Sequence, residues 1–160
     1  MKLVRNKAGF TLIEMVITAV LLGIIAAMAV PDFYRAMQKI KLNSTTRDII
    51  SDLRWARSKA IASRTQVGLH FNFDAKTYVV FLDTYNPSGL QYTAGQDSVI
   101  TTYNLSNIGT ASSTFGNNTV IFKPDGTCNT SGQVTCNSTD NNNTHVVDVL
   151  SSTGRIKITS

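Results

Sequence analysis

Residues 10–30, FTLIEMVITAVLLGIIAAMAV, form an apolar run that contains a single ionisable side chain, Glu14. At a rise of about 1.5 Å per residue, a helix of this length reaches roughly 30 Å, which is enough to cross the hydrocarbon core of a bilayer. Three basic side chains precede the run. Because positive charge stays on the cytoplasmic side, everything after Pro31 is predicted to lie outside the cytoplasm.

Glu14 distinguishes this run from a plain membrane anchor. A carboxylate in hydrocarbon costs about 2.5–3.5 kcal/mol on insertion scales, so it usually has a partner and a function. Cleavage between Gly9 and Phe10 would create an ammonium group four residues before Glu14, one helical turn away or on a neighbouring chain. One alternative stays open: cleavage of a secretory signal after residues 27–29, Ala-Met-Ala, would release a soluble secreted domain.

Residues 31–65 are predicted to continue the helix as an amphipathic stem that ends near Ser63. The apolar positions recur at i, i+4, i+7 and i+11, at Ile49, Leu53, Ala56 and Ala60. Such a stripe needs a sheet to cover it. The basic positions of the same segment, Arg54, Arg57 and Lys59, fall elsewhere on the helical wheel. We interpret them as a solvated face.

From Val67 onward the apolar period changes from 3.6 to 2, which is typical of half-buried strands. Strands are predicted at 67–73, 78–82, 99–103, 119–122, 145–150 and 155–159, and a polar loop at 137–143. A helix followed by consecutive antiparallel strands is an α+β fold. The predicted organisation is a leader at 1–9, a transmembrane helix at 10–30, an amphipathic stem at 31–65 and an antiparallel β domain at 66–160.

The formal charge of +5 is unevenly distributed along the chain. Without a nine-residue leader, 12 basic residues remain against 10 acidic ones. Residues 31–65 carry eight basic and three acidic side chains, whereas residues 66–160 carry four basic and six acidic ones. The composition therefore does not predict a nucleic-acid-binding surface over the whole protein.

Cys128 and Cys136 flank a short polar segment and, in an exported protein, predict a disulfide. A zinc site would need His70 and His145 to join them, and neither spacing resembles a metal motif. The chain has no phosphate-binding loop, no nucleophile elbow and no His-Glu-x-x-His. Because Glu14 is the only glutamate, we expect no enzyme activity, no cofactor and no metal.

Residues 7–14, KAGFTLIE, resemble the prepilin peptidase site of type IV pilins and type II secretion pseudopilins. The resemblance implies that Gly9 is the last leader residue and that Phe10 becomes the N-methylated first residue of the mature chain. It also implies that Glu14 neutralises the terminal amine of an adjacent subunit during assembly.

The resemblance extends to Gly23 and Pro31, between which the helix is implied to loosen when subunits pack into a filament. A proline removes a helix hydrogen bond and clashes with the preceding turn, which weakens the helix just before it. A simpler reading remains, in which Pro31 only marks the exit from the membrane.

Three later segments are similar to one branch, the GspH/FimT group of minor pilins and pseudopilins. They are the stem at 53–67, FKPDG at 122–126 and GRIK at 154–157. Residues 83–118 match no part of that pattern. The resemblance implies a subunit of a type IV pilus or of a type II secretion pseudopilus. Its expected partners are other pilin or pseudopilin subunits, prepilin peptidase and the bacterial inner membrane before assembly.

Some minor pilins of the FimT kind bind double-stranded DNA during natural transformation. Carried over by resemblance, the contacts would be Arg155 and Lys157, with Lys123 a weaker candidate. A spacing of two places Arg155 and Lys157 on one face of a strand, from which both could contact phosphates. Against this, Lys157 lacks the bidentate geometry of an arginine, and basic residues also protect sheet edges from aggregation.

Overall fold

The computed structural model describes residues 9–140 and 142–159 of the chain. It divides into two compact units, Met1–Met37 and Gln38–Ser160. The predicted leader lies, apart from Gly9, outside the described residues. All of the fully buried apolar side chains belong to the second unit, so this unit contains a complete core of its own.

One helix, α1 (Leu12–Ser63), supplies the described part of the first unit and the start of the second. Its end at Ser63 confirms the predicted end of the stem. Pro31 lies inside the helix and does not end it, although its missing amide removes one backbone hydrogen bond. Within the second unit, the predicted apolar stripe is completely buried: Ile49, Leu53, Ala56 and Ala60.

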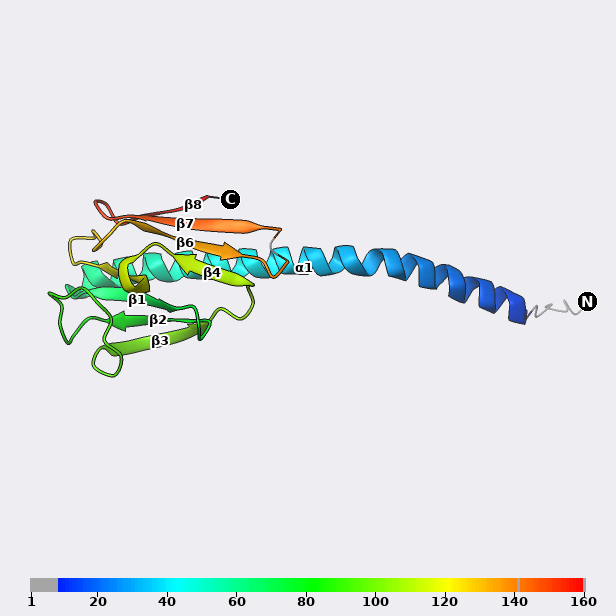
Figure 1. Ribbon diagram of the computed structural model, residues 1–160, viewed down its shortest axis with the longest axis horizontal. Coiled ribbons are helices and arrows are strands. Elements are labelled where there is room, and N and C mark those ends of the chain that lie inside the picture. The colour runs from blue at the N-terminus through cyan, green and yellow to red at the C-terminus, as the bar shows by residue number, and fades with distance from the viewer. Residues whose placement is uncertain (1–8, 141, 160) are drawn as a thin grey trace, which may run out of the picture. The chain divides into compact units, whose positions relative to one another are not determined.

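The strands of the described residues form two antiparallel sheets (Figure 1). Sheet A has the order β3-β2-β1-β5, with β1 (Val67–Asn72), β2 (Thr77–Leu82), β3 (Ser98–Asn104) and β5 (Thr119–Phe122). Sheet B has the order β4-β6-β7-β8, with β4 (Thr110–Ser113), β6 (Gly132–Asn137), β7 (Thr144–Leu150) and β8 (Arg155–Thr159). A short 3₁₀ turn, η1 (Gly116–Asn118), precedes β5. The α+β fold is therefore confirmed, with two sheets in the β domain.

The main core lies between the second part of α1 and the two sheets. It contains Leu69 and Phe71 of β1, Val134 of β6 and Val147 of β7, together with the buried stripe of the helix. Alternate residues of β1, β2, β6 and β7 enter this core, which is the pattern expected of half-buried strands, whereas β3 is exposed along its whole length. The core therefore joins elements that are far apart in the sequence.

All six predicted strands are present with bounds within one residue of those expected. The strands β4 and β6 were not predicted. The predicted polar loop at 137–143 begins one residue later than expected, because Asn137 is the last residue of β6; Asn141 lies outside the described residues.

The predicted disulfide is wrong, since Cys128 and Cys136 are free and buried. Cys136 is paired with His145 at the start of β7, whereas the amide of Cys128 donates to the carbonyl of Ser151, just beyond the end of β7. Six residues of extended chain separate these two contacts, about 20 Å at 3.3 Å per residue. A disulfide needs Cα atoms within about 7 Å. Cys128 instead directs its thiol to the carbonyl of Thr130 at 3.3 Å.

Candidate functional site

The N-terminal helix begins with a side-chain cap. The hydroxyl of Thr11 accepts a hydrogen bond from the amide of Glu14 at 3.3 Å, and the carbonyl of Thr11 accepts one from the amide of Met15 at 3.2 Å. Thr-x-x-Glu is the sequence pattern of a capping box. Glu14 consequently lies in the first turn of α1, where the exposed backbone amides favour a negative charge.

The apolar surface of the first unit is uncovered. Phe10 is 73% exposed, and the large apolar side chains that follow it up to Val30 are all about half exposed or more. The helix is long and apolar enough to span a membrane. Gly23 has no neighbouring atom within 4 Å of where a Cβ would lie, so its surface is open. Exposed apolar surface of this extent marks a membrane or protein contact.

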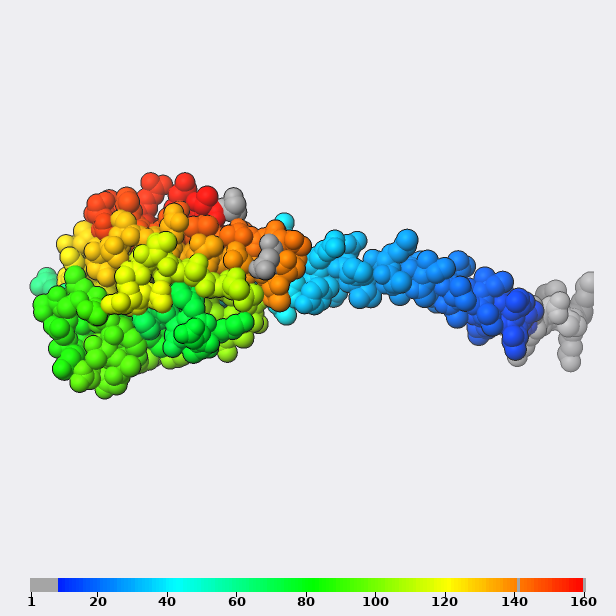
Figure 2. All heavy atoms as spheres, viewed as in Figure 1, coloured from blue at the N-terminus to red at the C-terminus, as the bar shows by residue number. Residues whose placement is uncertain are grey.

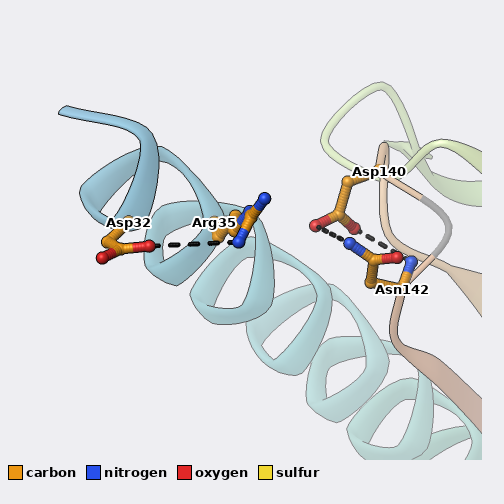
Figure 3. A network of polar contacts seen from close by, with 4 residues as sticks. All are labelled: Asp32, Arg35, Asp140 and Asn142. Carbon is orange, nitrogen blue, oxygen red and sulfur yellow. Dashed lines mark hydrogen bonds and ion pairs between the residues drawn. The ribbon is translucent and has the colours of Figure 1, made fainter. Parts of the chain in front are cut away.

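Charged residues follow the apolar part of the helix. Arg35 and Asp32, one turn apart, form an ion pair at 4.0 Å (Figure 3), the one ion pair within the described residues. Both side chains are well exposed, so the pair contributes little to stability. Its place marks the change from an apolar to a polar helix surface.

A second polar cluster closes the loop between β6 and β7. Asp140 accepts hydrogen bonds from the amide of Asn142 at 3.2 Å and from its side chain at 3.3 Å (Figure 3). Ser138 donates to the same carboxylate and is the main cause of a lowered Asp140 pKa. These bonds are local, so we assign the cluster to the loop conformation.

The second unit has a basic cavity of about 660 Å³ between α1 and the turn that joins β7 to β8. Its lining from the helix includes Arg54 and Arg57, and its lining from the turn and strand includes Gly154 and Arg155. No acidic side chain belongs to this lining. Three guanidinium groups without a carboxylate form a site suited to an anion.

Arg57 is held at this cavity by the turn after β5. Its Nε donates a hydrogen bond to the carbonyl of Gly126 at 3.0 Å. Gly154 lies against the same group: it has a φ of +60°, and a Cβ there would lie 2.8 Å from Nε of Arg57. The three segments that resemble the GspH/FimT pattern, at 53–67, 122–126 and 154–157, therefore meet at one place.

Arg155 and Lys157 are exposed on β8, an edge strand of sheet B, which Figure 2 shows in red on the surface of the unit. Both line a second cavity, of about 590 Å³, which confirms that they share a face. Lys157 is paired in register with Asp148, which lines the same cavity. Lys123 instead starts the turn that ends at Gly126, whose carbonyl accepts the hydrogen bond from Arg57.

The helical arginines were not predicted as part of a site. Arg54 and Arg57 lie off the apolar stripe, and we expected both to face solvent. Arg54 is exposed, but Arg57 is half buried. The only signal in the sequence was the co-occurrence of the three segments, which does not by itself say that they meet in space.

The two histidines have structural contacts. His70 shares a hydrogen bond with the hydroxyl of Thr119 at 2.8 Å and stacks on Tyr92, and burial lowers its pKa. His145 bonds through Nε2 to the side chain of Asn43 at 2.7 Å. Within the described residues, no three His, Cys, Asp or Glu side chains gather as a metal-binding group.

Comparison with known proteins agrees with this architecture. The family model of the type II transport protein GspH matches residues 45–154, and the prokaryotic N-terminal methylation motif matches residues 4–30. No curated protein matches the chain at a significant level.

Two solved structures are similar in fold. The type IV minor pilin FimU of Pseudomonas aeruginosa is 16% identical, with a TM-score of 0.59, over 78% of this chain and 92% of that one. The minor pseudopilin EpsH of the type 2 secretion system of Vibrio cholerae is 11% identical, with a TM-score of 0.57, over 75% and 97%.

Proposed function

The chain belongs to the family of the type II transport protein GspH, and from this premise we propose that it assembles through its N-terminal helix into a type IV pilus or a type II secretion pseudopilus. The observation that carries the proposal is the uncovered apolar surface of the first unit, with a single carboxylate in its first turn. Before assembly, the same surface would hold the chain in the bacterial inner membrane with the β domain outside the cytoplasm.

In this proposal, prepilin peptidase cleaves between Gly9 and Phe10, and Phe10 is N-methylated. The new ammonium group then lies close to the first turn of the helix. A positive charge is unfavourable there, because the exposed backbone amides at a helix N-terminus are themselves partly positive. The carboxylate of Glu14 on an adjacent subunit offsets that charge. Packing of apolar side chains between helices supplies affinity, and the Glu14–amine pair sets the register between subunits.

Mass spectrometry of the mature protein tests the cleavage. We expect a first residue of N-methylated Phe10. A first residue of Val30 would instead establish a secretory signal and contradict the proposal. Gly9→Leu is expected to leave the leader attached. Ala29→Leu serves as the matched control and should process normally, because only a secretory signal needs a small residue there.

A second candidate function is binding of double-stranded DNA during DNA uptake. The cavity lined by Arg54, Arg57 and Arg155 favours it, because arginine binds phosphate oxygens in a bidentate manner. Arg155 lines both this cavity and the one next to it, so Lys157 could extend the contact along a DNA backbone. Lys123, on the adjoining turn, is the weaker contact.

A salt titration tests this candidate on the soluble unit, Gln38–Ser160. If DNA binds, its affinity should fall as the salt concentration rises. The double variant Arg155→Ala/Lys157→Ala should bind DNA more weakly. The slope of log affinity against log salt concentration should also become shallower, by about one unit for each phosphate that the variant no longer binds. Arg47→Ala, an exposed helix position away from the cavity lining, is the control. Absence of binding at low salt would contradict DNA binding and leave the assembly proposal unaffected.

A further inference from the structure

Residues 83–97 cover the outer face of sheet A, the face that points away from the main core. Phe81 and Ile121 are both fully buried but do not belong to the main core cluster. The ring of Tyr92 packs on Phe81 with centroids 4.8 Å apart, and it stacks on His70 at the same distance. Tyr92 therefore packs the segment against this second, smaller apolar cluster.

Two buried carboxylates stand at the two ends of this segment. Asp83 follows β2 and is 4% exposed, and Asp97 precedes β3 and is 6% exposed. Asp97 holds the segment closed: its oxygens accept from the amides of Thr84 and Tyr85, each at 3.1 Å, and from the amide of Thr93 at 2.7 Å. Its carboxylate therefore lies against the backbone that directly follows Asp83.

Asp83 has no such partners. Neither of its carboxylate oxygens has a hydrogen-bond donor, and both are buried. Burial, and after it the negative charge of Asp97, raises the pKa of Asp83. Within the described residues, no basic side chain forms an ion pair with either carboxylate. A buried carboxylate without a donor or a counter-charge is costly, and proteins usually satisfy one with a pair or a metal ion.

A third unsatisfied oxygen belongs to Gln66, the residue that pairs with Asp83 across the sheet. The amide of Asp83 donates to the carbonyl of Gln66 at 3.1 Å, which continues the β1–β2 register by one residue. Cross-strand partners point to the same face of a sheet. The side-chain oxygen of Gln66 is buried and also has no donor. Three acceptor oxygens without donors, two on Asp83 and one on its cross-strand partner, are what a bound cation would satisfy.

We propose that Asp83, Asp97 and Gln66 bind a calcium ion that fastens the 83–97 segment to the outer face of sheet A. Ca²⁺ takes six to eight oxygen ligands from carboxylates, amide and backbone carbonyls and water, in flexible geometry. A site with two carboxylates needs such neutral oxygens to complete it, and it lacks the nitrogen and sulfur ligands that zinc prefers. Mg²⁺ requires near-ideal octahedral geometry and gives up its waters reluctantly, so it should bind more weakly. The site is independent of filament assembly.

The test is thermal unfolding of the full chain in detergent micelles, followed by circular dichroism, in EDTA and in excess Ca²⁺ or Mg²⁺. With a dissociation constant of about 10⁻⁴ M, typical of weak extracellular sites, millimolar Ca²⁺ should raise Tm by about 5 °C. Mg²⁺ should raise Tm less. Asp83→Asn should abolish the Ca²⁺ shift, and in EDTA it should melt no lower than the parent, because it removes a buried unpaired charge.

Asp74→Asn is the matched control, since Asp74 is exposed on the β1–β2 turn, and it should keep the full shift. If Asp83→Asn does not fold, Tb³⁺ luminescence of the parent, sensitised by the tyrosines of the segment and displaced by Ca²⁺, still tests the site. The proposal is contradicted if the parent shows neither a Ca²⁺-dependent Tm nor displaceable Tb³⁺. A shift of equal size in folded Asp83→Asn would place the ion elsewhere and would also contradict it.

Discussion

Nε of Arg57 lies 3.0 Å from the carbonyl oxygen of Gly126, and this hydrogen bond joins the C-terminal part of the stem to a turn 69 positions later in the chain. Gly154, from the turn between β7 and β8, packs against the same guanidinium group. An arginine of an otherwise polar helix face thus ties together α1 and both sheets. The basic character of the adjoining cavity is a consequence of this arrangement.

Arg57→Ala is expected to destabilise the second unit by about 1–2 kcal/mol, because it removes a half-buried, charge-assisted hydrogen bond and leaves the Gly126 carbonyl without its partner. Urea unfolding of Gln38–Ser160 measures the difference. Arg54→Ala, at an exposed position of the same cavity, should change stability by less than about 0.5 kcal/mol. Equal effects of the two substitutions would show that the Arg57–Gly126 bond has no special role.

Both cysteines are expected to be reduced thiols in the native protein. Burial raises the pKa of Cys136 to about 12 and raises that of Cys128 as well, so neither should react readily with thiol reagents in the folded state. Mass spectrometry after alkylation should find two labelled thiols in denaturant without reductant, and almost none under native conditions. Labelling that requires a reductant would demonstrate the disulfide that the structure excludes.

The contribution of Asp83 to stability in the absence of Ca²⁺ should fall as pH rises from mild acid to neutral, against the opposite contribution of His70, whose pKa burial lowers. The pKa of Asp83 is raised in the folded protein above its ordinary value of 3.8, so the folded state keeps a proton that the unfolded chain has lost. The stability that protonated Asp83 contributes is therefore fully present below the pKa of Asp83 in the unfolded chain. It is lost as the pH rises through the pKa of Asp83 in the folded protein. Asp52, whose pKa burial also raises, acts in the same direction.

The variant Asp83→Asn separates the contribution of Asp83 to the pH dependence of stability from that of Asp52. Urea unfolding in EDTA at about pH 4.5 and about pH 7.5 should show a smaller loss of stability with rising pH for the variant than for the parent. The same pH dependence in both proteins would mean that Asp83 keeps an ordinary pKa. Its carboxylate would then have hydrogen-bond or ionic partners in the folded protein.

Periodicity predicted the elements whose side chains alternate cleanly. The stripe from Ile49 to Ala60 and the alternation of β1 each identify one element without reference to the rest of the chain, and both are confirmed. β4 carries the sequence TASS and has no large apolar residue, so no period marks it. β6 was missed because Cys136 was interpreted as one end of a disulfide loop, although it is a buried residue of a central strand.

Sites that depend on long-range contact were harder to predict. The N-terminal segment is contiguous, so Gly9, Phe10 and Glu14 could be identified together as one motif. Arg57 joins the basic cavity only because Gly126 and Gly154 reach it through turns whose positions depend on both sheets. The carboxylates of Asp83 and Asp97 are likewise brought together by the path of the segment between them, which shows no periodicity.

The central claim is that Glu14 sets the register of assembly, and filament incorporation of Glu14→Ala tests it most directly. The variant should be processed and should retain a folded β domain, because Glu14 is exposed and belongs to the first unit. Thr18→Ala, one turn further along the same exposed helix, serves as the control and should be incorporated normally. We expect Glu14→Ala to remain in the membrane and to be absent from sheared filaments. Its incorporation at the level of the parent would contradict the account.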